Sequence, residues 1–144
     1  MPEGPLTEAL RRPDAAWARE HLETDVVAWL TTIAQDGRPQ SSVISFLHED
    51  ESILFYSKPD TPKLRNIEWS PKVSFNLRSD HYGDHYLVIE GTAAVDHTVP
   101  PSDRHAAYHA KYLEPHAHWE MDVADVARDF SVPVRITPTR VRLA

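Results

Sequence analysis

The chain has no cysteine in its 144 residues, and this absence excludes several classes of protein at once. Thiol nucleophiles, cysteine-ligated zinc sites, iron–sulfur clusters and disulfide frameworks all need this side chain. A domain near this length removes about two-thirds of its unfolded surface from water on folding, so a hydrophobic core can hold it together without a disulfide or a metal. The sequence therefore predicts one compact domain over residues 1–144.

Glycine is also scarce, with four residues at Gly4, Gly37, Gly83 and Gly91. No two of them have the spacing of the dinucleotide-binding pattern G-x-G-x-x-G or of the P-loop. No serine lies in the pattern G-x-S-x-G, which is typical of serine hydrolases. Glycine-rich nucleotide sites and this class of hydrolase are therefore excluded.

Positive charge and long apolar runs are in short supply as well. Fifteen Lys and Arg against 22 Asp and Glu give a formal net charge of −7, which repels nucleic acid and acidic membrane surfaces. The longest apolar stretches, residues 26–30 and 86–89, are far shorter than the roughly 20 residues that span a bilayer. The first residues contain no apolar signal segment. We therefore expect a cytoplasmic protein with small-molecule ligands and no binding to nucleic acid or membranes.

What the chain does contain is a series of strand-like segments rich in β-branched and aromatic residues. They predict six strands, at residues 26–34, 40–48, 53–57, 73–78, 85–99 and 131–143. Asp36-Gly37 between the first two predicts a hairpin, because glycine adopts a positive φ without steric cost. In the last segment the apolar phase flips around Pro138, which predicts a bulge there.

Capping residues and prolines predict short helices between these strands. The helices are expected at residues 14–23, from Asp60 or Thr61 to just before Pro71, from Ser102 to about Tyr112, and at residues 119–130. This order of elements favours a mainly β (α+β) fold, in which six antiparallel strands form a barrel-like sheet with short flanking helices.

The nine histidines raise the question of a metal site. His105 and His109 lie one helical turn apart, but the glutamate of the zinc-protease helix pattern is missing between them. A solvated helix face is the favoured interpretation, and no metal is predicted.

The most informative block runs from Tyr56 to Asn66, where a strand leads through a turn into a helix. The start of that helix offers free backbone N–H groups, and Lys58, Lys63 and Arg65 place cations around it. This arrangement suits a small phosphate. An ordinary Thr-Pro helix cap with solvated lysines explains the same residues equally well.

Four segments in order resemble the split β-barrels of the pyridoxamine 5'-phosphate oxidase-like family, and most closely its small members assigned to FMN or F420. The segments are DGRPQSSVI, FYSKPDTPKLRNI, SPKVSFNL and VIEGTA, and RITPTRVRL resembles the closing strand. The resemblance implies a six-stranded antiparallel split β-barrel. It also implies a homodimer that holds F420 or FMN in a groove between its subunits.

The resemblance assigns site residues by their place in these segments. Lys63 matches the phosphate-binding lysine of the family, and Thr61 matches the small or basic residue before it. Tyr56 and Ser57 match the strand end beside the phosphate and the ribityl chain. Ser42 and Val43 match the strand whose backbone meets the ring edge.

One difference from the oxidase proper is Pro62, where that oxidase has an arginine. Lys58 or Arg65 would have to replace that phosphate partner. The vitamin B6 determinants of the oxidase lie in a C-terminal extension, so oxidation of that vitamin is not expected of this chain.

Two hypotheses follow for the function. The first is an oxidoreductase that transfers hydride between F420, or FMN, and a small organic substrate, with no catalytic side chain because the cofactor carries the chemistry. The second is a non-enzymatic carrier of flavin or haem with the same barrel, and a haem role would require one histidine as an axial ligand.

Overall fold

The computed structural model describes residues 3–144, and this part of the chain forms seven strands and five α-helices. The strands are β1 (Ala28–Ile33), β2 (Pro39–Ile44), β3 (Leu47–Glu49), β4 (Ser52–Ser57), β5 (Lys72–Asn76), β6 (Leu87–Val95) and β7 (Val132–Leu143). The helices are α1 (Pro5–Leu10), α2 (Ala16–Thr24), α3 (Pro62–Trp69), α4 (Ala106–His118) and α5 (Val123–Asp129), with a 3-10 turn at Pro13–Ala15.

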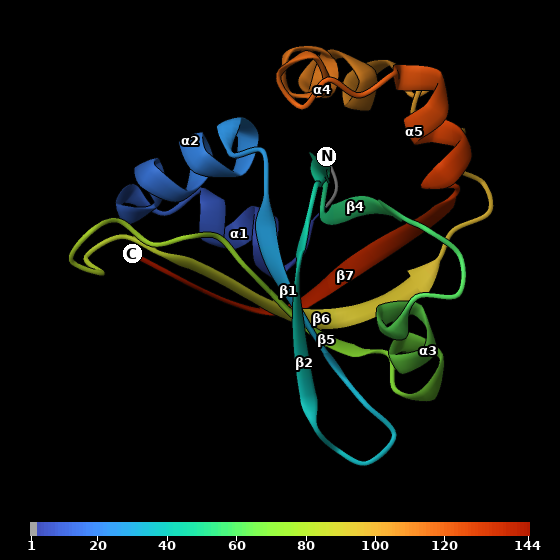
Figure 1. Ribbon diagram of the computed structural model, residues 1–144. Helices are drawn as coiled ribbons and strands as arrows, with labels where there is room; N and C mark the ends of the chain where they lie inside the picture. The colour runs from blue at the N-terminus through green and yellow to red at the C-terminus, as the bar shows by residue number, and fades with distance from the viewer. Residues whose placement is uncertain (1–2) are drawn as a thin grey trace.

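All seven strands form one antiparallel sheet in the order β2-β1-β5-β6-β7-β4-β3. The sheet curls into a half-barrel, with α1 and α2 at one end and α4 and α5 at the other (Figure 1). The predicted mainly antiparallel split barrel with short helices is confirmed. Because β2 and β3 are the outermost strands, each keeps one backbone edge without a strand partner.

The number of strands is seven rather than the predicted six, because the segment predicted as one strand over residues 40–48 is broken after Ile44. At the break, the backbone N–H of Phe46 donates to the Tyr112 hydroxyl at 2.7 Å, and its carbonyl accepts from Lys111 Nζ at 2.8 Å. Side chains of α4 therefore satisfy the peptide groups that a continuous strand would pair with a neighbour.

Two local features of the sheet confirm predictions made from the sequence. Gly37 has a φ of 85° in the turn between β1 and β2, and Ile33 pairs with Pro39 across it. The pairing of β6 with β7 shifts register between Glu90 and Gly91, at the point where Gly91 faces Pro138. The bulge predicted from the phase flip is therefore present.

The helix boundaries differ more from the prediction. Helix α1 was not expected, and α4 continues to His118 instead of ending near Tyr112. The helix predicted from residue 119 begins at Val123, because the Asp122 carboxylate accepts hydrogen bonds from the backbone N–H groups of Ala124 and Asp125.

Two apolar clusters hold these elements together. The larger one fills the barrel beneath α1 and α2 and includes Leu6, Leu22, Leu30 and Phe75. The smaller one packs α4 against β3 and β4 through the residues Leu47, Leu54, Tyr56, Tyr108 and Tyr112. In the described residues, no helix has the length and hydropathy needed to cross a membrane.

Candidate cofactor site

A cavity of about 240 Å³ lies between the end of β2 and the helices α4 and α5. Strand residues, one α3 side chain and the segment before β7 all contribute to its wall. The lining residues are Val27, Val43, Ile44, Ser45, Tyr56, Lys63, Ser102, Tyr108, His116, Trp119, Met121, Val126 and Phe130. The cavity thus joins three of the residues predicted from the sequence, Val43, Tyr56 and Lys63, to a set that was not predicted.

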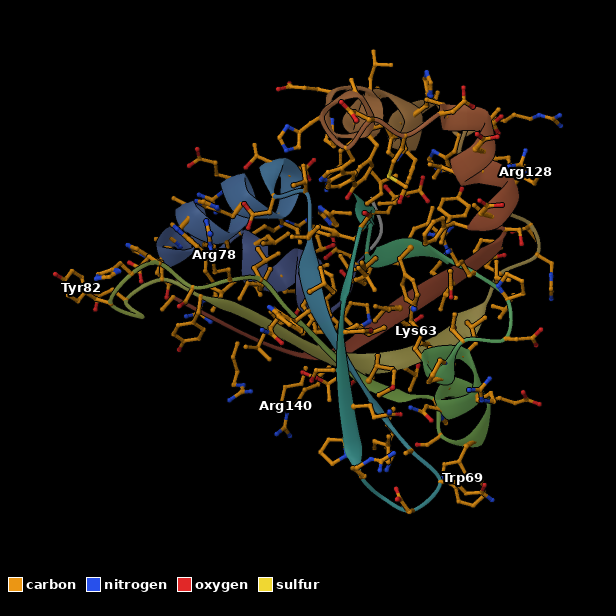
Figure 2. All side chains as sticks on the ribbon, in the orientation of Figure 1. Lys63, Trp69, Arg78, Tyr82, Arg128 and Arg140 are labelled. Carbon is orange, nitrogen blue, oxygen red and sulfur yellow. The ribbon has the colours of Figure 1, made fainter. Side chains whose placement is uncertain are left out.

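Lys63 is the cation of this wall. It belongs to the first turn of α3, and Figure 2 shows it where this helix meets the sheet. The side chain is half-buried, and burial lowers the pKa of Lys63 below its ordinary value. Within residues 3–144 no carboxylate lies close enough to pair with it. Desolvation and the positive end of the helix dipole both destabilise the charged ammonium of Lys63. A bound anion offsets both effects.

The start of α3 has the sequence of a Thr-Pro cap but not its hydrogen bond. Thr61 is the N-cap residue and Pro62 follows it, yet the Thr61 side chain caps no backbone N–H. Instead its hydroxyl lies 3.1 Å from the Ser57 hydroxyl, which donates to the Lys58 carbonyl at 2.8 Å. These two predicted residues therefore shape the turn, and they leave the first N–H groups of α3 without a side-chain acceptor.

The two candidates for the missing arginine lie in different places. Lys58 Nζ sits 5.2 Å from the ring centroid of Phe130, a residue of the cavity wall. Arg65 donates to the Asp60 carbonyl at 2.6 Å and lines a separate hollow on the flank of α3. Lys58 is therefore the closer of the two to the cavity.

The predicted residues of β2 lie on opposite faces of that strand. Ser42 pairs with Leu30, whose side chain is fully buried, and Ser42 is not part of the cavity lining. Val43 pairs with Trp29 on the outer face and does line the cavity. The strand as a whole has one free backbone edge, so it can offer N–H and C=O groups to a ligand.

Tyr56 contributes its ring rather than its hydroxyl. The hydroxyl donates to the Pro100 carbonyl at 2.6 Å. Burial, followed by the negative charge of Glu49, raises the pKa of Tyr56 to about 12. Tyr56 therefore stays protonated near neutral pH, and its role in the wall is packing.

The roof of the cavity comes from the segment between Ser102 and Phe130, in which the sequence predicted helices but no cofactor-binding residue. Tyr108 makes an edge contact with Tyr56 at 4.8 Å between ring centroids and stacks on Tyr112 at 4.7 Å. Tyr108, Tyr112 and His116 are four residues apart, so they share one face of α4. This spacing is the signal that could have revealed the roof.

His105, one of the histidines weighed as a metal ligand, caps α4 instead. Its Nδ1 accepts from the Tyr108 backbone N–H at 3.3 Å, and its Nε2 lies 2.9 Å from a carboxylate oxygen of Glu49. No group of three or more His, Asp or Glu side chains able to hold a metal ion occurs in residues 3–144.

Apolar side chains continue from the cavity onto the outer face of the β1–β2 hairpin. Val27, Trp29 and Val43 are 41%, 47% and 50% exposed. Val27 and Val43 also line the cavity, so the apolar surface runs from the cavity to the outside of the sheet. Exposed patches of this kind mark interaction surfaces.

Comparison with known proteins shows what this arrangement is similar to. The family model described as pyridoxamine 5'-phosphate oxidase matches residues 16–144. General stress protein 26 of Bacillus subtilis (strain 168) is 29% identical over 85 residues, which are 58% of this chain and 60% of that relative. The matched segment therefore spans about three-fifths of the relative.

Solved structures agree on the fold. An F420 reductase superposes with a TM-score of 0.63 and 23% identity, covering 99% of this chain and 98% of that one. The heme storage protein HutZ of Vibrio cholerae superposes with a TM-score of 0.65 and 16% identity, covering 92% and 95%. At these identities the likeness establishes the fold and leaves the ligand open.

Proposed function

Since the chain belongs to the pyridoxamine 5'-phosphate oxidase family, we propose that it is an oxidoreductase that binds F420 or FMN in the cavity beside Lys63. F420 comes first, because the sequence segments most resemble members assigned to it, and FMN is the alternative. The proposed reaction is hydride transfer between this cofactor and a small organic substrate.

The observation that carries the proposal is the state of Lys63. This lysine is half-buried, has no carboxylate partner in the described part of the chain, and stands at a helix start whose N–H groups lack a side-chain cap. In an ordinary Thr-Pro helix cap, the lysine that follows would be solvated rather than half-buried. The cofactor's phosphate fits this site because it supplies the negative charge and the hydrogen-bond acceptors that the site lacks.

The bound flavin or deazaflavin supplies the redox chemistry, so the residues of this chain have three tasks. Lys63, assisted by Lys58 at the rim, binds the phosphate. The free edge of β2 offers backbone groups that orient the ring system. The apolar roof over the cavity excludes water, which strengthens the polar contacts inside.

We also propose that the site is completed by a second copy of the chain. The cavity of about 240 Å³ is smaller than the about 300–1,000 Å³ of typical small-molecule sites. The exposed apolar residues Val27, Trp29 and Val43 adjoin its rim, and a two-fold partner would cover them. Light scattering at micromolar concentration should give the mass of two 16.4 kDa chains.

The direct test is titration of the purified apo-protein with F420 and with FMN. Binding in the micromolar range or tighter is expected for one of them, followed by absorbance or fluorescence. If neither cofactor binds at that level, the proposal is wrong.

Carriage of haem is the second candidate, and one residue favours it. His116 lines the cavity with an imidazole that could serve as an axial iron ligand. A Soret band that forms on addition of haem and disappears in His116→Ala would support carriage. Steady turnover of reduced F420 with an organic acceptor would argue for the oxidoreductase instead.

A further inference from the structure

His116 is the polar side chain of the roof that the phosphate site does not use. It is only 7% exposed and lines the cavity. Lys111 and Tyr112 of α4, and its N-cap residue His105, form side-chain hydrogen bonds. No group in residues 3–144 is a hydrogen-bond partner of the His116 ring.

The ring nitrogens of His116 are nevertheless not sealed in. In the described residues, no buried side-chain nitrogen or oxygen is both cut off from the surface and without a partner. The ring nitrogens of His116 therefore keep some accessible surface, and the cavity is an open space that this residue lines. Contacts with Tyr112 and Trp119, at 5.6 Å and 6.2 Å between ring centroids, flank the ring. A ring nitrogen that is accessible and has no protein partner is free to form a hydrogen bond with a ligand.

The surroundings define the chemistry of that ligand. Burial and the neighbouring His109 lower the pKa of His116, so the imidazole is neutral at neutral pH. Its neighbours in the roof are Trp119, Met121, Val126 and Phe130, and no Asp or Glu lines the cavity. A cationic ligand would find no counter-ion at this end, and an anionic one is matched only by Lys63.

We propose that the roof is the substrate subsite of this cavity, and that His116 binds the carbonyl oxygen of an uncharged, largely apolar substrate by a hydrogen bond. A neutral imidazole carries one N–H donor, and a carbonyl oxygen accepts it. The inference rests on the proposed oxidoreductase function, because a carbonyl compound is one class of substrate that a hydride-transferring cofactor reduces. His116 is thus a specificity-determining residue of the same site.

The test uses acetophenone and ethylbenzene, two molecules of similar shape of which only the first has a carbonyl. Their binding to the parent, to His116→Phe and to His116→Gln is measured by NMR titration. Changing His116 to Phe should weaken acetophenone binding about three- to tenfold relative to ethylbenzene, the range of one net hydrogen bond. His116→Gln keeps an N–H donor and should recover part of this difference. In the parent, acetophenone alone should shift the ring ¹⁵N signals of His116.

The inference would be overturned if His116→Phe changed the affinities for acetophenone and ethylbenzene equally, or if acetophenone did not shift the ring ¹⁵N signals. Either result would show that His116 only fills space. The ¹⁵N measurement needs no variant, so it decides the matter even if His116→Phe folds poorly. FMN and F420 titrations of the same proteins separate the two proposals. If a cofactor binds but His116→Phe does not change the preference for acetophenone over ethylbenzene, only the subsite is refuted, whereas absence of cofactor binding in the parent refutes the oxidoreductase.

Discussion

Replacing Lys63 by alanine is the most direct test of the phosphate site, because it removes one interaction with the cofactor and little else. Lys63 forms no ion pair in the described residues, so the substitution leaves no carboxylate unpaired. Burial already lowers the pKa of Lys63, which means that the folded protein disfavours its charged form. The apo-protein should therefore be as stable without this lysine, or slightly more stable.

The expected loss of affinity follows from the type of bond. A hydrogen bond to a charged group contributes about 1.5–3 kcal/mol, and the phosphate would make such a bond with the half-buried Lys63 ammonium. Since each 1.4 kcal/mol is a factor of about ten, the dissociation constant for F420 or FMN should rise about tenfold to a hundredfold.

The assay is a cofactor titration at constant ionic strength, with thermal unfolding of the apo-proteins in parallel. Lys72→Ala is the matched control, because Lys72 is an exposed lysine on β5 that does not line the cavity. Its cofactor affinity should equal that of the parent. If Lys63→Ala binds both cofactors as tightly as the parent, Lys63 is an ordinary residue of a helix start and the phosphate site lies elsewhere.

Three further substitutions probe the frame around the site. Tyr112→Phe leaves the buried N–H of Phe46 without its acceptor and should lower the free energy of unfolding by about 1–3 kcal/mol in urea denaturation, whereas Tyr82→Phe, at an 84% exposed position, should change nothing. Burial lowers the pKa of Lys111 to about 8 from 10.5, so the native state binds fewer protons than the unfolded state between these pH values. The stability of the parent relative to Lys111→Met should therefore rise with pH across that window, and a flat or falling difference would contradict the assignment. Gly91→Ala places a Cβ against a β7 backbone carbonyl and should cost about 1–3 kcal/mol of stability, again measured in urea.

The features that the sequence predicted well depend on residues close to one another in the chain. The Asp36-Gly37 turn needs only a glycine that accepts a φ of 85°, and the strands on either side follow from it. The bulge next to Pro138 was visible as a change of apolar phase within one segment. In both cases the cause and the effect lie within a few residues.

The break after β2 has a distant cause, so the sequence could not reveal it. Residues 40–48 are as strand-like after Ile44 as before it. What ends the strand is the pair of hydrogen bonds that Phe46 makes with Tyr112 and Lys111, which are 66 and 65 positions away. Local propensity favours a strand here, and the tertiary contact with α4 overrides it.

The candidate site also has one part that depends on local sequence and one that depends on distant contacts. The proposed phosphate side is a continuous strand, turn and helix from Tyr56 to Lys63, and such a local motif can be read from the sequence. The sequence offered Arg65 and Lys58 as replacements for the missing arginine. The Arg65 guanidinium donates to the Asp60 carbonyl and does not line the cavity, and only the geometry of α3 shows this.

The roof side depends wholly on how α4 and α5 fold back over the sheet, and this has a consequence for function. Lys63 and His116 come from segments about 50 residues apart, and no side-chain hydrogen bond or ion pair joins them in the described residues. A double-mutant cycle of Lys63→Ala and His116→Phe tests whether the two ends of the cavity act independently, in which case their free-energy changes in ligand binding add. Additive changes would make phosphate affinity and substrate selectivity separate properties of the proposed site. A chain could then keep the strand, turn and helix proposed to hold the phosphate while the segment from Ser102 to Phe130 adapts to another substrate.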